Sequence, residues 1–235
     1  METTMIDKST SGRAVPAAGI LAVAAIAFSL AATRPARADT PATAATASPA
    51  PLQIYGPQGA VSPNVLFLGT PTNWAYTVPT AGTAALDAGS IRVEPTKVGG
   101  ENGIKVTWTG GIGQIYSQSK LAEDQLDQLD ANGAVVFDAV VHKKPEDQVT
   151  MRIDCRYPCM GIVDMTGFFK AAPLETKITV KIPLSCFEAT GTRFTAVNTP
   201  WLIFTTKPFA MSLANIRWSP GAGKDPDVVK CGGAN

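Results

Sequence analysis

Two cysteines four positions apart, Cys155 and Cys159, are the residues whose type and spacing point most directly to chemistry. With His142, the single histidine, they could bind zinc, although that site needs a fourth ligand and reduced thiols. A C-x-x-C redox pair is excluded, because three residues separate these two cysteines. The remaining interpretation is a disulfide that closes the short loop at residues 156–158.

The N-terminal residues indicate the compartment, which decides between these chemistries. Residues 1–13 are polar with basic side chains, residues 14–32 form an apolar run, and Ala36 and Ala38 make an A-x-A site. This order predicts a secretory signal peptide over residues 1–38. The run is short for a membrane span of about 20 residues, and a retained anchor is the alternative. We therefore expect a secreted or periplasmic protein with no membrane contact after cleavage.

Export favours disulfides, and the four cysteines of the remaining chain allow three pairings. We favour Cys155–Cys159, which is local, together with Cys186–Cys231, which would tie the C-terminal tail to the body. Loop-closure entropy predicts about 2 kcal/mol of stabilisation from the first and about 4 kcal/mol from the second. These pairings leave no thiolate for zinc, so we expect no metal and no cofactor.

Composition divides the rest of the chain into three parts. Residues 39–51 are rich in Pro, Ala and Thr and are typical of a disordered linker. Residues 52–220 have the length of one domain, and residues 221–235 form a Gly-rich tail. The chain has 20 basic and 19 acidic side chains, a balance that gives no electrostatic case for a nucleic-acid or membrane partner.

Alternation of apolar and polar residues with period two predicts half-buried antiparallel strands through most of the body. It is clearest over residues 103–110, 134–142, 148–155, 176–184, 201–206 and 209–219. Short helical turns are expected only within residues 119–129, 166–172 and 186–190. Strands with one apolar face must pack that face against another sheet, so we predict an all-β, jelly-roll-like sandwich.

The strands at 134–142 and 148–155 are joined by the five residues "KKPED", which predicts a hairpin. In a hairpin symmetric about Pro145, Asp138 would lie opposite Arg152 and share its outward face with Asp154. With Lys181, these residues could form a polar binding face. The alternative is a solvated sheet surface that carries a cross-strand ion pair.

The motifs "NGAVVFD", "IPLSCF", "MSLANIRW" and the C-x-x-x-C of Cys155 and Cys159 followed by "VDMT" occur here in one order. In that order and spacing the chain resembles, over about residues 52–219, the galactose-binding-like C-terminal domain of ExoP-type bacterial β-glucan exohydrolases of glycoside hydrolase family three. Two departures are visible: Asn215 and Asn102 stand near positions where that family usually has acidic residues.

The resemblance implies an accessory domain that stands alone, because the nucleophile of such enzymes lies in a preceding barrel that exceeds this chain in length. The residues agree with a protein that is not an enzyme. No motif singles out a pair of carboxyl groups for glycoside hydrolysis. A Ser-His-Asp triad would require His142, which we expect to be a solvated loop residue. We therefore expect no catalytic residues.

Carbohydrate binding needs exposed aromatic rings that stack on sugars and polar groups that bind their hydroxyls. Trp108 and Trp218 alternate with core residues and are expected to be buried, whereas Trp201 is undecided. The candidate contacts are Trp74, Tyr76, Tyr116, Asp138, Arg152, Asp154, Tyr157 and Lys181.

Two functions follow from these residues and from the resemblance. The first is a secreted, non-catalytic carbohydrate-binding module for β-glucan or galactose-like glycans. The alternative is an interaction or structural module that docks onto a separate glycoside hydrolase or a cell-surface assembly. An exposed aromatic platform would favour the first, and a broad apolar patch would favour the second.

Overall fold

The computed structural model describes residues 48–79 and 83–232. The predicted signal peptide and most of the predicted linker lie outside these residues. No helix in the described part of the chain has the length and apolar character needed to cross a membrane.

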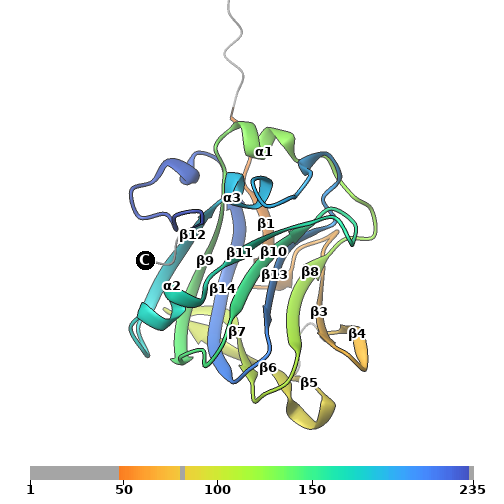
Figure 1. Ribbon diagram of the computed structural model, residues 1–235, viewed down its shortest axis with the longest axis vertical. Helices are drawn as coiled ribbons and strands as arrows, with labels where there is room; N and C mark the ends of the chain where they lie inside the picture. Colours follow the sequence, from red (N-terminus) through yellow and green to blue (C-terminus); the bar gives the residue numbers. More distant parts are fainter. Residues whose placement is uncertain (1–47, 80–82, 233–235) are drawn as a thin grey trace, which may run out of the picture. The chain divides into compact units, whose positions relative to one another are not determined.

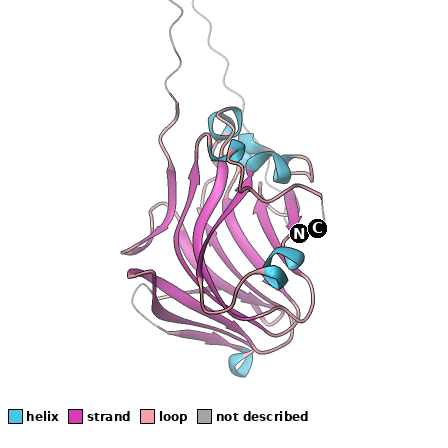
Figure 2. Cartoon of the chain, turned by 90° about the vertical axis from the view of Figure 1, so that its left-hand side faces the viewer, coloured by secondary structure: helices cyan, strands magenta, loops and turns pink. Residues whose placement is uncertain are grey.

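Two antiparallel sheets stack face to face (Figures 1 and 2), which confirms the predicted all-β sandwich. The eight-stranded sheet consists of β12 (Lys177–Pro183), β9 (Ala134–Lys143), β14 (Phe209–Ser219), β7 (Glu101–Trp108), β6 (Ile91–Val98) and β5 (Ala84–Leu86), with β1 (Leu52–Gly56) paired to β14 and β2 (Gly59–Ala60) paired to β1. The six-stranded sheet has the order β11 (Met160–Asp164), β10 (Val149–Asp154), β13 (Thr199–Thr205), β8 (Gly113–Gln118), β3 (Val65–Thr70) and β4 (Asn73–Thr77).

Aromatic side chains fill the core between the sheets. Trp108 stacks on Phe209 at a centroid distance of 5.6 Å, and Phe137 meets the ring of Trp201 edge-on at 6.5 Å. Trp108, Trp201 and Trp218 are fully buried. The prediction that Trp108 and Trp218 are core residues is confirmed, and Trp201, which the sequence left undecided, is a core residue as well. Full burial of one large apolar side chain contributes about 1.5–3 kcal/mol, so these contacts dominate the stability of the sandwich.

Each of the three predicted spans overlaps a short α-helix: α1 (Leu126–Asp130) ends one residue beyond its span, α2 (Thr166–Ala171) lies within its span, and α3 (Leu184–Glu188) begins two residues before its span. Helix α2 begins where the Asp164 carboxylate accepts a hydrogen bond from the Thr166 N–H at 2.8 Å, and it buries Phe169 in the core. Helices α1 and α3 lie together at one end of the sandwich (Figure 1). The 3₁₀ helices are η1 (Asp87–Gly89), η2 (Phe194–Ala196) and η3 (Ala222–Lys224).

The predicted hairpin between β9 and β10 is wrong. Strand β9 pairs with β12 and β14, whereas β10 pairs with β11 and β13 in the other sheet. The connection "KKPED" therefore crosses between the sheets, and the inward faces of β9 and β10 meet across the core. Both strands bury alternate apolar residues, and face-to-face packing satisfies that pattern as well as a hairpin does.

Both favoured disulfides are present. Cys155–Cys159 spans a Cα–Cα distance of 5.0 Å, and Cys186–Cys231 spans 5.1 Å. The thiols of Cys155 and Cys159 are therefore joined to each other and cannot act as the zinc ligands of the rival hypothesis.

The C-terminal tail covers the edge strand β12. The Val229 N–H donates to the Lys181 carbonyl at 2.8 Å, and the Lys181 ammonium lies 2.7 Å from Asp225 and 2.9 Å from Asp227. A covered edge cannot pair with another chain, so the Cys186–Cys231 disulfide protects the sheet from association through this edge.

Replacing both Cys186 and Cys231 with alanine should lower the free energy of unfolding by about 4 kcal/mol, because the tail would no longer be tethered in the unfolded chain. Replacing Cys155 and Cys159 should cost about 2 kcal/mol, because that loop is much shorter. Urea unfolding of both double variants measures the difference. Equal losses, or a larger loss from the short loop, would contradict this ranking.

Candidate functional site

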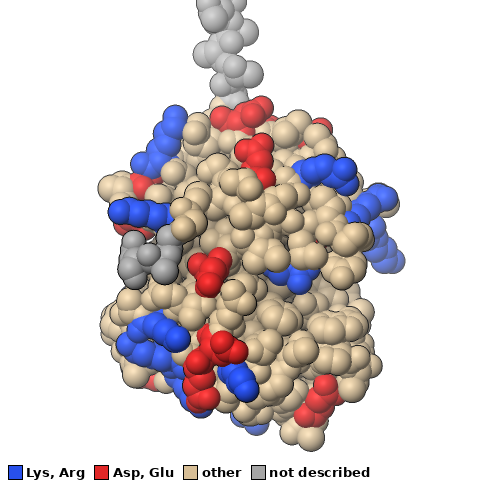
Figure 3. Space-filling model, viewed as in Figure 1, with Lys and Arg blue, Asp and Glu red and all other residues tan. Residues whose placement is uncertain are grey.

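The outer face of the six-stranded sheet carries a continuous row of side chains, one from each of five neighbouring strands. The strand registers place Phe67, Tyr116, Leu202, Arg152 and Ile162 side by side. In Figure 1, β10 and β11 pass in front of β9 and β14, so this face is turned toward the viewer. Figure 3 shows the same side, and its surface over β3 and β4 carries no charged side chains.

Arg152 and Asp154 form an ion pair within this face. The Nη2–Oδ2 distance is 3.0 Å, and the two side chains are only 14% and 9% exposed. Burial raises the pKa of Asp154, and the charge and hydrogen bonds of Arg152 oppose that rise. The guanidinium uses Nε and Nη2 on Asp154, whereas its Nη1 group has no partner among the described residues. A fixed donor therefore remains for a ligand hydroxyl.

Tyr116 was predicted as a sugar contact, but it is buried, with only 6% of its surface exposed. Its ring is therefore not accessible for stacking on a sugar. The ring stacks on Phe67 at 5.2 Å, and the hydroxyl donates to the Trp74 carbonyl at 2.6 Å. Burial, together with the charge of Asp154, raises the pKa of Tyr116 to about 12. Tyr116 thus links β8 to β3 and β4 instead of presenting an aromatic surface.

Strand β4 forms one margin of the face. A Cβ atom at Gly69 would point outward from β3 and lie 2.9 Å from the Trp74 carbonyl oxygen, so the start of β4 passes over β3 at this glycine. Trp74 and Tyr76 on β4 are 47% and 37% exposed. Both predicted aromatics are therefore accessible. The register pairs Thr77 with Phe67 of the row and Tyr76 with the buried Leu68, so Tyr76 lies on the other side of β4 from the row.

The loop closed by the Cys155–Cys159 disulfide begins directly after Asp154, at the end of β10. Tyr157 lies three residues after Asp154 and is 75% exposed. The loop is held by the Cys155–Cys159 disulfide and by a hydrogen bond from the Arg156 N–H to the Asn198 side chain at 2.8 Å. A third predicted aromatic is therefore exposed on a constrained loop.

Asp138 and Lys181 lie on the opposite outer face, so the prediction of one polar face shared with Arg152 and Asp154 is wrong. Asp138 accepts from Thr179 at 2.8 Å and pairs with Lys177 at 2.9 Å. Lys181 holds the C-terminal tail. The prediction failed because it assumed a hairpin of β9 and β10, whereas these two strands belong to different sheets.

His142 belongs to β9, so its prediction as a solvated loop residue is also wrong. Its Nε2 lies 2.7 Å from Ser212 Oγ and its Nδ1 lies 2.9 Å from a Glu175 carboxylate oxygen. This is the order of a serine–histidine–acid relay. Ser212 is 1% exposed and sits in β14, which pairs with β7 and β9 on both sides. The Ser212 hydroxyl is therefore shielded from solvent, and the hydrogen bonds among the three residues fasten Glu175 to the sheet.

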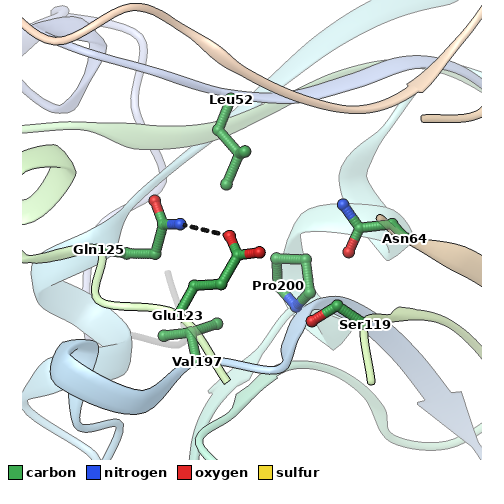
Figure 4. Close-up of a pocket in the computed structure, with 7 residues that line it drawn as sticks. All are labelled: Leu52, Asn64, Ser119, Glu123, Gln125, Val197 and Pro200. Carbon is green, nitrogen blue, oxygen red and sulfur yellow. Dashed lines mark hydrogen bonds between the residues drawn. The ribbon is translucent and has the colours of Figure 1, made fainter. Parts of the chain in front are cut away.

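Among the described residues, a small notch and a larger groove lie at the edge between the sheets. A notch of about 10 Å³ is lined by Leu52, Asn64, Ser119, Glu123, Gln125, Val197 and Pro200 (Figure 4). This volume holds roughly one water molecule and not a sugar ring. A groove of about 530 Å³ lies beside it, between residues of β3 and β4 and residues of β6 and β7. Sequence analysis missed the groove, because no motif marks residues that meet only through sheet packing.

The two stacked sheets define this domain as a galactose-binding-like β-sandwich. The family model Exop_C, described as galactose-binding domain-like, matches residues 62–218, and the chain belongs to that family. No curated protein matches the sequence significantly.

Solved structures agree on the fold. The extra C-terminal domain of the exo-1,3/1,4-β-glucanase ExoP from a Pseudoalteromonas species has 13% identity and a TM-score of 0.63, over 77% of this chain and 98% of that chain. In the complete ExoP enzyme the match has 11% identity, a TM-score of 0.63 and the same share of this chain, but spans 22% of that chain. A family 30 carbohydrate-binding module of the Clostridium thermocellum cellulosomal cellulase Cel9D-Cel44B has 18% identity and a TM-score of 0.52, over 73% of this chain and 98% of that chain.

The raised pKa of Tyr116 predicts a loss of stability at alkaline pH. An unfolded tyrosine ionises near pH 10, whereas Tyr116 stays neutral in the fold until about 12. The folded state therefore binds more protons in this interval, and the free energy of unfolding falls as pH rises. Tyr116→Phe should make that fall shallower, as measured by urea unfolding between pH 9 and 12. Tyr55, whose pKa burial also raises, still contributes in both proteins. An unchanged slope would contradict the assignment.

Gly69→Ala should destabilise the protein by about 1–3 kcal/mol, because the added methyl meets the Trp74 carbonyl oxygen of β4, which cannot rotate away, and the Gln114 side chain of β8. Gly167→Ala is the matched control. Its Cβ would meet nothing within 4 Å in α2, where alanine should be neutral or stabilising by about 0.5–1 kcal/mol. Comparing the urea midpoints of the two variants checks this, and equal stability would show that β4 does not pass over Gly69.

Proposed function

We propose that this domain is an exported, non-catalytic carbohydrate-binding module whose glycan lies across the outer face of the six-stranded sheet. The observation that carries the proposal is the partly desolvated Arg152–Asp154 pair, set in an apolar row between exposed aromatics on β4 and on the disulfide loop. The fold shared with a family 30 carbohydrate-binding module supports it.

The chemistry of this face suits a sugar chain. Trp74 and Tyr157 supply exposed rings for the apolar faces of sugars, and Arg152 supplies a fixed donor for a hydroxyl. The hydrogen bond from Tyr116 fixes β4, and the disulfide fixes the loop that carries Tyr157. Fixed groups lose little conformational entropy on binding, so weak individual contacts suffice for useful affinity.

A β-linked glucan is the proposed ligand class, with galactose-like glycans second. The structural relative from Pseudoalteromonas belongs to an exo-1,3/1,4-β-glucanase, which favours this class. An extended chain also suits a sheet face better than it suits a closed pocket. The module comprises residues 52–220 in this proposal, after a cleaved signal peptide (1–38) and a linker (39–51). Two disulfides support a secreted or periplasmic location.

The second candidate function is docking onto a separate glycoside hydrolase or cell-surface assembly. The match to 22% of the complete ExoP chain favours it, because the matched domain there is part of a larger enzyme. The exposed apolar residues Val65 and Ile162 on the same sheet would contribute to such a contact. Val65 and Ile162 are 40% and 41% exposed, and they lie on strands that do not adjoin.

Trp74→Ala and Tyr157→Ala should each weaken binding to mixed-linkage β-glucan by about fivefold, because each removes roughly 1 kcal/mol of ring contact. Leu174→Ala is the matched control, because Leu174 is 47% exposed like Trp74 but contacts β9 of the other sheet. It should leave binding unchanged. Affinity electrophoresis in gels that contain β-glucan, laminarin or galactan provides the measurement.

Retardation by none of the three glycans would contradict the proposal, and so would equal losses in the Leu174 variant. Binding to galactan alone would correct the ligand class and leave the site in place. If no glycan binds, capture of a glycoside hydrolase by the wild-type protein but not by an Ile162→Asp variant would support docking instead.

A further inference from the structure

The groove between the sheets is large enough to hold a ligand. Its volume of about 530 Å³ lies within the roughly 300–1,000 Å³ that is usual for small-molecule sites. The turn between β1 and β2 closes one side, β3 and β4 form a second side, and β6 and β7 form the third. None of the residues proposed as glycan contacts on the outer face of the six-stranded sheet lines it, whereas Val65, named for the alternative docking contact, does.

The groove is uncharged. None of the described residues that line it is Asp, Glu, Lys, Arg or His. The nearest basic group on β6, Lys97, directs its ammonium to the Asn102 side chain at 2.7 Å. Asn102 lines the groove, so an anion would find only this one ammonium, which is already bonded, and a cation would find no carboxylate among the described lining residues. A neutral ligand is therefore favoured.

Two buried polar side chains in the groove have unused hydrogen-bonding capacity. Tyr55 and Asn64 are each 8% exposed, and within residues 48–79 and 83–232 neither the Tyr55 hydroxyl nor the Asn64 amide has a partner. Neither group is among the fully buried side-chain atoms that lack a partner, so both reach the solvent of the groove and are free to bond a ligand that enters it. Asn64 also borders the neighbouring notch, where Figure 4 shows its side chain.

The remaining lining combines hydroxyls with proline rings. Thr77 and Thr96 contribute hydroxyl groups, and Pro57, Pro79 and Pro95 contribute rigid apolar surface. A neutral sugar matches both, because its hydroxyls donate and accept while its ring faces are apolar. A proline-rich peptide fits less well, since such peptides dock in grooves lined by exposed aromatics, and the one aromatic here, Tyr55, is buried.

We propose that this groove is a second binding site, separate from the outer face, for a short neutral oligosaccharide or the end of a neutral glycan chain. Hydroxyls of the sugar complete the hydrogen bonding of Tyr55 and Asn64, and the prolines contact its ring faces. The domain would then hold a glycan at two places, with β3 and β4 lying between them.

The test uses the disulfide-intact protein that carries Trp74→Ala and Tyr157→Ala, so that the outer face no longer contributes. Isothermal titration with cellotriose and laminaritriose should show one site per chain for at least one of them. Thr96→Trp, which fills the groove, should weaken that binding at least tenfold. Thr107→Trp on β7 is the control, because Thr107 does not line the groove, and it should bind like its parent.

Tyr55→Phe removes only the hydroxyl and should weaken binding about fivefold, which keeps the test sound if the Thr96 variant fails to fold. Trigalacturonate and decaproline serve as the charged and peptide probes. The proposal is overturned if no neutral trisaccharide binds, if neither groove variant weakens binding, or if either of these probes binds more tightly than the sugars. None of these results touches binding of polymeric glycan to the outer face, which is measured by the Trp74 and Tyr157 variants alone.

Discussion

Face-to-face packing of two antiparallel sheets is the constraint on which the rest of this structure depends. Three fully buried tryptophans and the phenylalanines beside them fill the space between the sheets, and each strand must turn alternate side chains toward them. That alternation leaves every second residue outside, where it is free to be polar. Helices α1 and α3 lie at one end of this core (Figure 1), and the Cys186–Cys231 disulfide holds the tail against the edge strand β12.

The two outer faces are used differently. On the eight-stranded sheet, Lys177 pairs with Asp138 and lies against the turn at Gly99, and Lys181 binds the C-terminal tail. These two lysines therefore serve internal contacts. On the six-stranded sheet the ion pair of Arg152 and Asp154 sits in an apolar row that no described helix covers. We accordingly propose that binding takes place on this second face and in the groove at the edge between the sheets.

Much of the fold could be predicted from local pattern. Period-two alternation located β7, β9, β10, β12, β13 and β14 to within about two residues, a usual margin for strand ends. It also identified Trp108 and Trp218 as core, and the spacing of the cysteines favoured the correct disulfides. Exposure of Trp74, Tyr76 and Tyr157 was anticipated, because prolines or a pinned loop flank them.

What local pattern could not give is the partner of each strand. Strands β9 and β10 are adjacent in sequence yet lie in different sheets, which separated Asp138 from Arg152. Tyr116, His142 and the groove were missed for the same reason, since their surroundings come from strands far apart in the chain.

The central claim is that glycan binds on the outer face of the six-stranded sheet beside β4. The four tryptophans allow a direct test, because Trp74 is 47% exposed whereas Trp108, Trp201 and Trp218 are at most 1% exposed. Nitrogen-15 NMR resolves one indole N–H signal for each ring, and a Trp74→Phe variant assigns the signal of interest. Addition of a mixed-linkage β-glucan oligosaccharide should shift the Trp74 signal saturably and leave the three buried signals in place. Saturable binding by calorimetry without any shift of the Trp74 signal would contradict the account.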